Sequence, residues 1–214
     1  MFQWMQKENI YSVKLLFFVA ALFFQSCFSG KDLSVSLPEK CWAMRHPFVL
    51  HKAIDCTNKA KKITDSILLT NKLDGDANGG QLDAFRHACW MALLTKNIGY
   101  HRALSLGRAH EKGNYQSFLK RKNEDGSLAD KAATDMDLWN NKMGAAISKQ
   151  YKGKDLLILY DVIISSIQSG RMKMIKKNLR GQSLDDNGNI IPGRGNEKIW
   201  NTTRVLVPSD YIRQ

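Results

Sequence analysis

The sequence lacks an apolar stretch long enough to cross a bilayer as a helix, which takes about 20 residues. It contains four cysteines but no Cys-x-x-Cys pair, which argues against a zinc site built from thiolates. It has no internal repeat, no low-complexity tract and no motif of a nucleic-acid-binding module. The sequence therefore points away from a thiolate metal site and from a nucleic-acid-binding module.

Residues 1–26 have the pattern of a signal peptide. Two lysines precede an apolar run at 15–24, and the run has the length of a signal-peptide core. Ser26-Cys27 follows, as in the lipobox of bacterial lipoproteins, although Phe24 departs from the usual leucine. We expect cleavage before Cys27, lipidation there, and anchoring in the bacterial cell envelope on a membrane facing the periplasm or the exterior. Ordinary secretion and an uncleaved anchor are the alternatives.

The chain is strongly basic, with a net charge of +12. Removing the signal peptide takes away two lysines and one glutamate, which lowers that charge by one. A basic domain tethered to a bilayer is attracted to anionic phospholipid headgroups. The lysines are scattered and do not alternate with aromatic residues, so we expect no specific nucleic-acid partner. The plainer interpretation is that the excess charge is solvated surface.

The part after the signal peptide is long enough for one domain with a hydrophobic core. Its periodicity predicts an all-α, single helical-bundle domain with a small C-terminal β-hairpin. The predicted helices lie at about 55–72, 82–97, 100–118, 127–150 and 155–169, and the hairpin lies at 181–192. The predicted segments are a lipoprotein signal peptide at 1–26, a tether at 27–50, a helical domain at 51–180, and a β-hairpin with a basic tail at 181–214.

Three cysteines remain once Cys27 is lipidated. Cys41 and Cys56 could pair in an oxidising compartment, closing a short loop. Cys89 lies in an apolar helical stretch and is predicted to be a small buried residue.

Polar side chains occur at positions that otherwise have the pattern of a helix core. Asp83 and His87 are four residues apart, as are Asp137 and Asn141, so each pair shares one helix face. His110-Glu111 lies on the helix between them. Burying such groups costs free energy unless they pair, bind a metal or take part in chemistry. The three clusters therefore predict a site between the helices, and a purely structural polar network is the alternative.

The predicted catalytic residues are those with acid, base or ligand chemistry in these clusters. They are His87, His110, Glu111 and Asp137, supported by Asp83, Arg86, Asn140 and Asn141. His87, His110 and Asp137 could hold a divalent metal such as zinc. A metal-free site in which histidine and aspartate activate water is the alternative. His110-Glu111 does not begin a His-Glu-x-x-His zinc motif, because Asn114 stands where the second histidine would be.

A loop before the second predicted helix matches the first half of an EF-hand calcium loop, with Asp74, Asp76, Asn78 and Gly79 at the expected spacing. Phe85 stands where the loop needs its bidentate glutamate. We therefore interpret the segment as a turn.

The polar clusters also carry a resemblance. Asp-Ala-Phe-Arg-His-Ala from Asp83, Ala-His-Glu ending at Glu111, and Met-Asp-x-x-Asn-Asn-x-x-Gly ending at Gly144 resemble an uncharacterised bacterial helical domain family. That family occurs in secreted and cell-surface proteins, and the resemblance covers roughly residues 50–180. It implies a helical fold, and the family has no assigned activity. A weaker likeness is to prokaryotic phospholipase A2, whose catalytic pair lies in an Arg-His-Asp stretch. Here His87 precedes alanine, and the paired cysteines of that family are missing.

Two functions follow from these observations. The first is a lipid-anchored envelope protein with a hydrolase-like site, acting on a lipid or another anionic envelope substrate. The second is a non-enzymatic binding or scaffold lipoprotein, in which the buried polar groups only fix the packing of the helices.

Overall fold

The computed structural model of the chain describes residues 35–120, 129–191 and 199–213. The predicted signal peptide, Cys27 and its lipidation lie outside these residues, as does Ser127. Residues 36–214 form one compact unit. Among the described residues, none of the helices combines the length and the apolar character needed to cross a membrane.

The described residues are mostly helical, which confirms the predicted all-α fold class. The helices are α2 (Leu37–Arg45), the short 3-10 helix η1 (Pro47–Val49), α3 (Leu50–Leu68), α4 (Gln81–Ile98), α5 (Tyr100–Leu119), α6 (Lys131–Gln150) and α7 (Leu156–Gln168). Two short strands, β1 (Lys173–Ile175) and β2 (Leu206–Pro208), complete the described elements.

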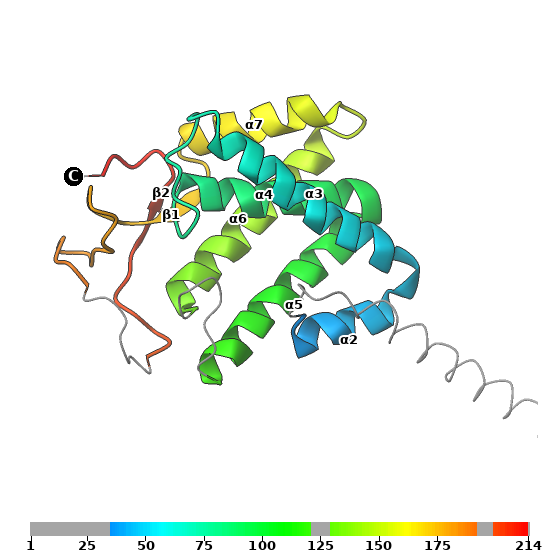
Figure 1. The fold of residues 1–214 in the computed structure, drawn as a ribbon, viewed down its shortest axis with the longest axis horizontal. Helices are drawn as coiled ribbons and strands as arrows, with labels where there is room; N and C mark the ends of the chain where they lie inside the picture. The colour runs from blue at the N-terminus through cyan, green and yellow to red at the C-terminus, as the bar shows by residue number, and fades with distance from the viewer. Residues whose placement is uncertain (1–34, 121–128, 192–198, 214) are drawn as a thin grey trace, which may run out of the picture. The chain divides into compact units, whose positions relative to one another are not determined.

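Helix α4 is the centre of the fold and contacts α3, α5, α6, α7 and β1 (Figure 1). Its apolar residues point in several directions, and Phe85, Met91 and Leu94 are all fully buried. A helix that is apolar all round belongs in a core. The polar groups that α4 carries, Asp83 and His87, are therefore held in the interior rather than on a solvated face.

Two glycines let the neighbouring helices approach α4 closely. A Cβ atom on Gly144 of α6 would lie 2.1 Å from the carbonyl oxygen of Ala88 on α4. On α5, a Cβ atom on Gly107 would lie 3.2 Å from Nδ2 of Asn141 and 3.4 Å from Sδ of Met91. Only glycine permits the α4–α6 approach, and this approach brings the polar residues of α6 against α4.

One helix start differs from the sequence predictions: α3 begins at Leu50 and not near residue 55. Helix α5 runs through Gly113 to Leu119, close to its predicted end at 118. A Cβ atom on Gly113 would lie 2.3 Å from Oγ of Ser36. This glycine therefore makes room for the start of α2 and does not end α5.

The predicted tether at 27–50 contains a capped helix, α2. The Ser36 side chain accepts from the Glu39 amide, and the Glu39 carboxylate accepts from the Ser36 amide. This reciprocal capping box satisfies two amide groups that a helix start otherwise leaves unpaired.

The two-stranded sheet lies elsewhere than the predicted hairpin at 181–192. Strand β1 pairs antiparallel with β2, with Met174 opposite Val207. In the described part of the predicted hairpin, Leu184 forms an isolated bridge with Ile190, and Ser183 forms one with Lys177. The regular pairing forms between segments about thirty residues apart in the chain, a separation that local turn signals do not reveal.

The three cysteines in the described residues are free thiols, so Cys41 and Cys56 form no disulfide in this structure. Cys89 is buried as predicted. Burial raises the pKa of the Cys56 thiol to about 11 and that of Cys89 to about 12. Thiols with such pKa values stay protonated and unreactive at neutral pH.

Five charged residues tie the C-terminal segment to the helices, and we call them the C-terminal clamp: Asp76, Asp130, Lys177, Arg204 and Arg213. Nζ of Lys177 lies 2.6 Å, and Nη2 of Arg213 lies 2.7 Å, from Oδ2 of Asp76. Nη1 of Arg204 lies 3.2 Å from Oδ2 of Asp130. The turn with calcium-loop spacing thus directs its Asp76 carboxylate at cationic side chains of the protein, which supports its interpretation as a turn.

Candidate functional site

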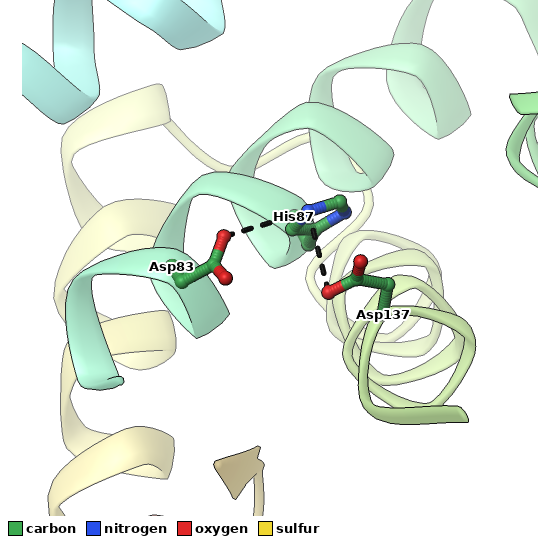
Figure 2. A group of neighbouring side chains, drawn as sticks. All are labelled: Asp83, His87 and Asp137. Atoms are coloured by element: carbon green, nitrogen blue, oxygen red, sulfur yellow. Dashed lines mark ion pairs between the residues drawn. The ribbon is translucent and has the colours of Figure 1, made fainter. Parts of the chain in front are cut away.

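Three buried ligand-type side chains converge between α4 and α6 (Figure 2). Asp83 and His87 project from α4, Asp137 projects from α6, and we call them the buried triad. Nε2 of His87 lies 3.3 Å from Oδ1 of Asp137 and 3.6 Å from Oδ1 of Asp83. One ligand atom from each residue lies within 4.8 Å of the other two.

The position of Asp83 follows from its place in the first turn of α4. Its Oδ2 accepts a 2.7 Å hydrogen bond from the Gly79 amide, and its Oδ1 accepts from the Arg86 guanidinium one turn later. An acidic group in the first turn also interacts favourably with the helix dipole. Local helix-start chemistry therefore holds one carboxylate against His87.

His87 is the most buried member of the triad, with 3% of its surface exposed. Burial holds the pKa of its imidazole well below 6.5, and the charge of Arg86 and the neighbouring His110 act in the same direction. Within the described part of the chain, neither ring nitrogen makes a well-directed hydrogen bond. A neutral imidazole in this state is the form that binds a metal or accepts a proton.

The two adjacent asparagines of α6 have different surroundings. Asn140 donates from Nδ2 to the Lys173 carbonyl and accepts at Oδ1 from the Lys173 amide, both at 2.9 Å, and so fixes β1 on α6. Asn141 is buried beside His87, and its contact partly opposes the lowering of the pKa of that imidazole. Among the described residues, neither amide atom of Asn141 has a well-directed hydrogen-bond partner. Asn141 therefore carries a buried donor and a buried acceptor that a ligand could use.

His110 lies beside the triad but is not part of it. Its ring centroid is 6.5 Å from that of His87 and 5.5 Å from that of Trp90. Its Nδ1 lies 3.0 Å from Oε1 of Glu39 on α2. Asp83 thus takes the place beside His87 and Asp137 that the sequence analysis gave to His110.

Glu39 is the residue of this region that the sequence analysis missed. The Ser36 amide and hydroxyl both donate to its Oε2, at 2.8 and 2.6 Å, which leaves Oε1 for His110. Burial alone would raise the pKa of Glu39, but the interactions with His110 and Ser36 lower it below 4.5. The Ser-x-x-Glu spacing was a signal for a capping box, but no local pattern indicates that its second oxygen reaches α5.

The two remaining predicted residues lie around this arrangement. Arg86 is partly exposed and interacts with Asp83. Glu111 is buried on α5, where its Oε2 accepts a 3.2 Å hydrogen bond from Nδ2 of Asn114. Neither belongs to the group whose ligand atoms converge.

The arrangement is suited to two kinds of chemistry. Two carboxylates and one imidazole form a ligand set for zinc or a similar divalent ion, with coordination positions left for water or substrate. Without a metal, a neutral imidazole next to a carboxylate can activate water. A histidine held by a carboxylate, His110 with Glu39, lies close enough to supply a second acid or base.

Comparisons with known proteins give a family but no activity. No curated protein and no solved structure matches this chain. A family model described as a domain of unknown function (DUF6973) matches residues 40–171. The matched region contains the buried triad, His110 and Asn141, whereas Glu39 lies one residue before it. The match spans more than half of the chain, and the protein therefore belongs to the DUF6973 family.

Proposed function

We propose that this protein is a metal-dependent hydrolase of the bacterial cell envelope, with the buried triad as its metal site. One observation carries the proposal: three ligand atoms from Asp83, His87 and Asp137 converge within 4.8 Å in the protein interior. The imidazole in this group has no well-directed hydrogen bond within the described residues. Buried polar atoms normally have partners, so a bound cation would account for a ring nitrogen of His87 that has no hydrogen bond.

The donor atoms of the triad support a cation. Asp83 and Asp137 contribute carboxylate oxygens, and burial lowers the pKa of His87, which favours the neutral imidazole. Carboxylate oxygen and neutral imidazole nitrogen are the donors that zinc and similar divalent ions bind. Within the described residues neither ring nitrogen of His87 makes a well-directed hydrogen bond, and a divalent cation would give one of them a partner.

The residues around the metal would divide the work of hydrolysis. A divalent metal supplies a Lewis acid and lowers the pKa of water. His110, oriented by Glu39, would take or deliver the proton, because it lies next to His87 and its side chain is 25% exposed. Asn141 would orient water or substrate with its buried amide. Glu111 is the second candidate base.

A metal-free mechanism is supported by a different contact. Asp137 lies 3.3 Å from His87, so a His–Asp pair forms between two helices. The same variants would inactivate either site, and only the metal-dependent one would respond to a chelator.

The proposed substrate is a phospholipid or another anionic molecule of the envelope. The proposal is supported by the Ser26-Cys27 lipobox after a short apolar run and by a net charge of +12 over the whole chain. A lipidated Cys27 would supply more than one acyl chain, which is what stable anchoring requires. The tether would keep the site next to its substrate.

The test uses purified residues 28–214, which include the whole compact unit. Elemental analysis should find about one divalent metal per chain, and Asp137→Asn should lose it. A panel of phospholipids, simple esters and nucleic acids, assayed with and without chelator, should show turnover of a lipid or ester that the chelator removes. If no metal copurifies and nothing is hydrolysed, while His110→Ala and Asp137→Asn both melt at lower temperatures, the scaffold function replaces the hydrolase.

A further inference from the structure

Large apolar side chains are exposed in α2 and η1, at the start of the compact unit. Phe48 in η1 is 97% exposed, and Leu37 and Met44 on α2 are 62% and 57% exposed. Leu37 and Met44 are seven residues apart and therefore share one side of α2. Trp42 and Ala43 are the buried residues of α2, so these two residues, and not the exposed apolar ones, pack the helix against the fold.

The same stretch of chain is cationic. Three exposed basic residues alternate with the apolar ones along it, and we call the set of exposed residues the α2 face: Leu37, Lys40, Met44, Arg45, Phe48 and Lys52. Between Leu37 and Lys52 the only acidic residue is Glu39. Its carboxylate is occupied by Ser36 and His110. Apolar side chains surrounded by positive charge are typical of surfaces that bind anionic membranes.

The chain length before α2 limits how far this face can lie from a bilayer. Cys27 precedes Ser36 by nine residues, and a fully extended segment of that length spans about 30 Å. This step rests on the proposed lipidation of Cys27. If Cys27 is anchored, the start of α2 stays within that distance of the headgroups.

We infer that the α2 face is a membrane-docking surface, which places Phe48 and Met44 among the acyl chains of an anionic bilayer and its lysines and arginine at the headgroups. Helix α2 also packs on α5 and presents Glu39 to His110. One short helix thus joins the docking surface to the candidate site. Docking would hold His110 at a fixed depth relative to the lipid.

The experiment measures vesicle binding by residues 28–214, which lack Cys27 and therefore any lipid anchor. Vesicles of phosphatidylglycerol and phosphatidylethanolamine should pellet the protein, whereas phosphatidylcholine vesicles should not. Phe48→Ser should weaken binding about tenfold or more, because a phenyl ring no longer leaves water. Each of Lys40→Gln and Arg45→Gln should weaken it about fivefold, and added salt should do the same.

The matched control is Leu157→Ser on α7. Leu157 is 71% exposed, so its loss removes a comparable apolar surface outside the α2 face, and vesicle binding should not change. Equal binding by wild type and Phe48→Ser, or equal loss in Leu157→Ser, would overturn the inference. A dimer that Phe48→Ser dissociates, without vesicle binding, would also overturn it, because the α2 face would then be a subunit interface. Asp137→Asn should bind vesicles normally, which separates docking from the metal site.

Discussion

The buried triad and the C-terminal clamp both place carboxylates against nitrogen atoms of low exposure. They differ in the hydrogen bonds that those nitrogen atoms make. In the clamp, Lys177 lies 2.6 Å from Asp76, and the same ammonium donates to the Asn78 carbonyl. In the triad, the imidazole of His87 is 3.3 and 3.6 Å from its two carboxylates and makes no well-directed hydrogen bond among the described residues.

The difference lies in the partners and not in the burial. Asp130 is completely buried, yet it accepts from Thr202, from Arg204 and from the Ala133 amide at the start of α6. Charge-assisted hydrogen bonds of this kind offset the cost of removing a carboxylate from water. His87 and Asn141 are buried without such bonds, because within the described residues neither side chain makes a well-directed hydrogen bond. Burial alone therefore does not distinguish the two regions, whereas the imidazole of His87 and the amide of Asn141, buried without well-directed hydrogen bonds among the described residues, do.

The largest expected effect is on the clamp. Asp130→Asn keeps the shape of the side chain but leaves Arg204, whose side chain is 11% exposed, without its opposite charge. Breaking a buried pair in this way typically costs about 3–5 kcal/mol. Urea unfolding should show a loss of that size. Asp161→Asn, an exposed substitution on α7, is the control. A loss no greater than that of the control would mean that the clamp is not structural.

The corresponding change in the triad should affect binding more than folding. Asp137→Asn removes one ligand and should weaken binding of zinc by at least about a hundredfold, since even an indirect partner of a ligand contributes 10–100-fold. The unfolding free energy without metal should stay the same or rise, because one buried charge is lost. Isothermal titration with zinc and urea unfolding with chelator measure the two quantities. Asp135→Asn, exposed on the same helix, should change neither. Unchanged zinc affinity together with lower stability would make the triad a structural network.

The features that could be predicted from the sequence are those that lie within a single helix. The shared helix face of Asp83 and His87, and that of Asp137 and Asn141, follow from helical periodicity. These are properties within one helix. The approach of α4 to α6 brings the ligand atoms of Asp83, His87 and Asp137 together.

Contacts between distant segments could not be predicted in the same way. Glu39 meets His110 across 71 residues, and Arg213 meets Asp76 across 137. Strand β1 finds its partner in the C-terminal segment, and Asn140 holds that strand through the Lys173 backbone. Each partner has an ordinary local pattern, and only the packing of the whole chain brings them together.

The pH dependence of stability should show that the imidazole of His87 is neutral in the folded protein. Burial lowers the pKa of this imidazole well below 6.5, so below about pH 6.5 the unfolded chain takes up a proton that the folded one does not. The free energy of unfolding without metal should therefore decrease as the pH is lowered below about 6.5. The decrease should be up to about 1.4 kcal/mol per pH unit, until the folded-state pKa is reached. His87→Gln should remove this slope in urea unfolding at pH 7.5, 6.5 and 5.5.

The control for this pH dependence is His51→Gln. The His51 side chain is 89% exposed, so its removal should leave the slope as in wild type. An unchanged slope in His87→Gln would mean that the imidazole is protonated in the folded protein. The triad would then be an internal ion pair, of the same kind as the clamp.

The smallest expected loss of stability concerns the pair formed by Glu39 and His110, which has properties of both regions. Its Nδ1–Oε1 distance is 3.0 Å, as in a matched pair, but the pair lies beside the triad and is partly exposed, with 25% and 20% of the side chains accessible. Glu39→Gln should cost only about 0.5–1 kcal/mol, the usual contribution of one hydrogen bond. Zinc affinity should not change, because Glu39 is outside the triad. Without the carboxylate, the His110 ring should lose its fixed tautomer, which nitrogen NMR detects. Turnover of any substrate found in the hydrolysis assay should fall about a hundredfold if His110 is the base.

The matched control is Asp55→Asn, which removes the carboxylate from the exposed His51–Asp55 pair and should alter neither tautomer nor turnover at the site. A Glu39→Gln protein with an unchanged His110 tautomer would remove Glu39 from the site and leave it as a helix cap.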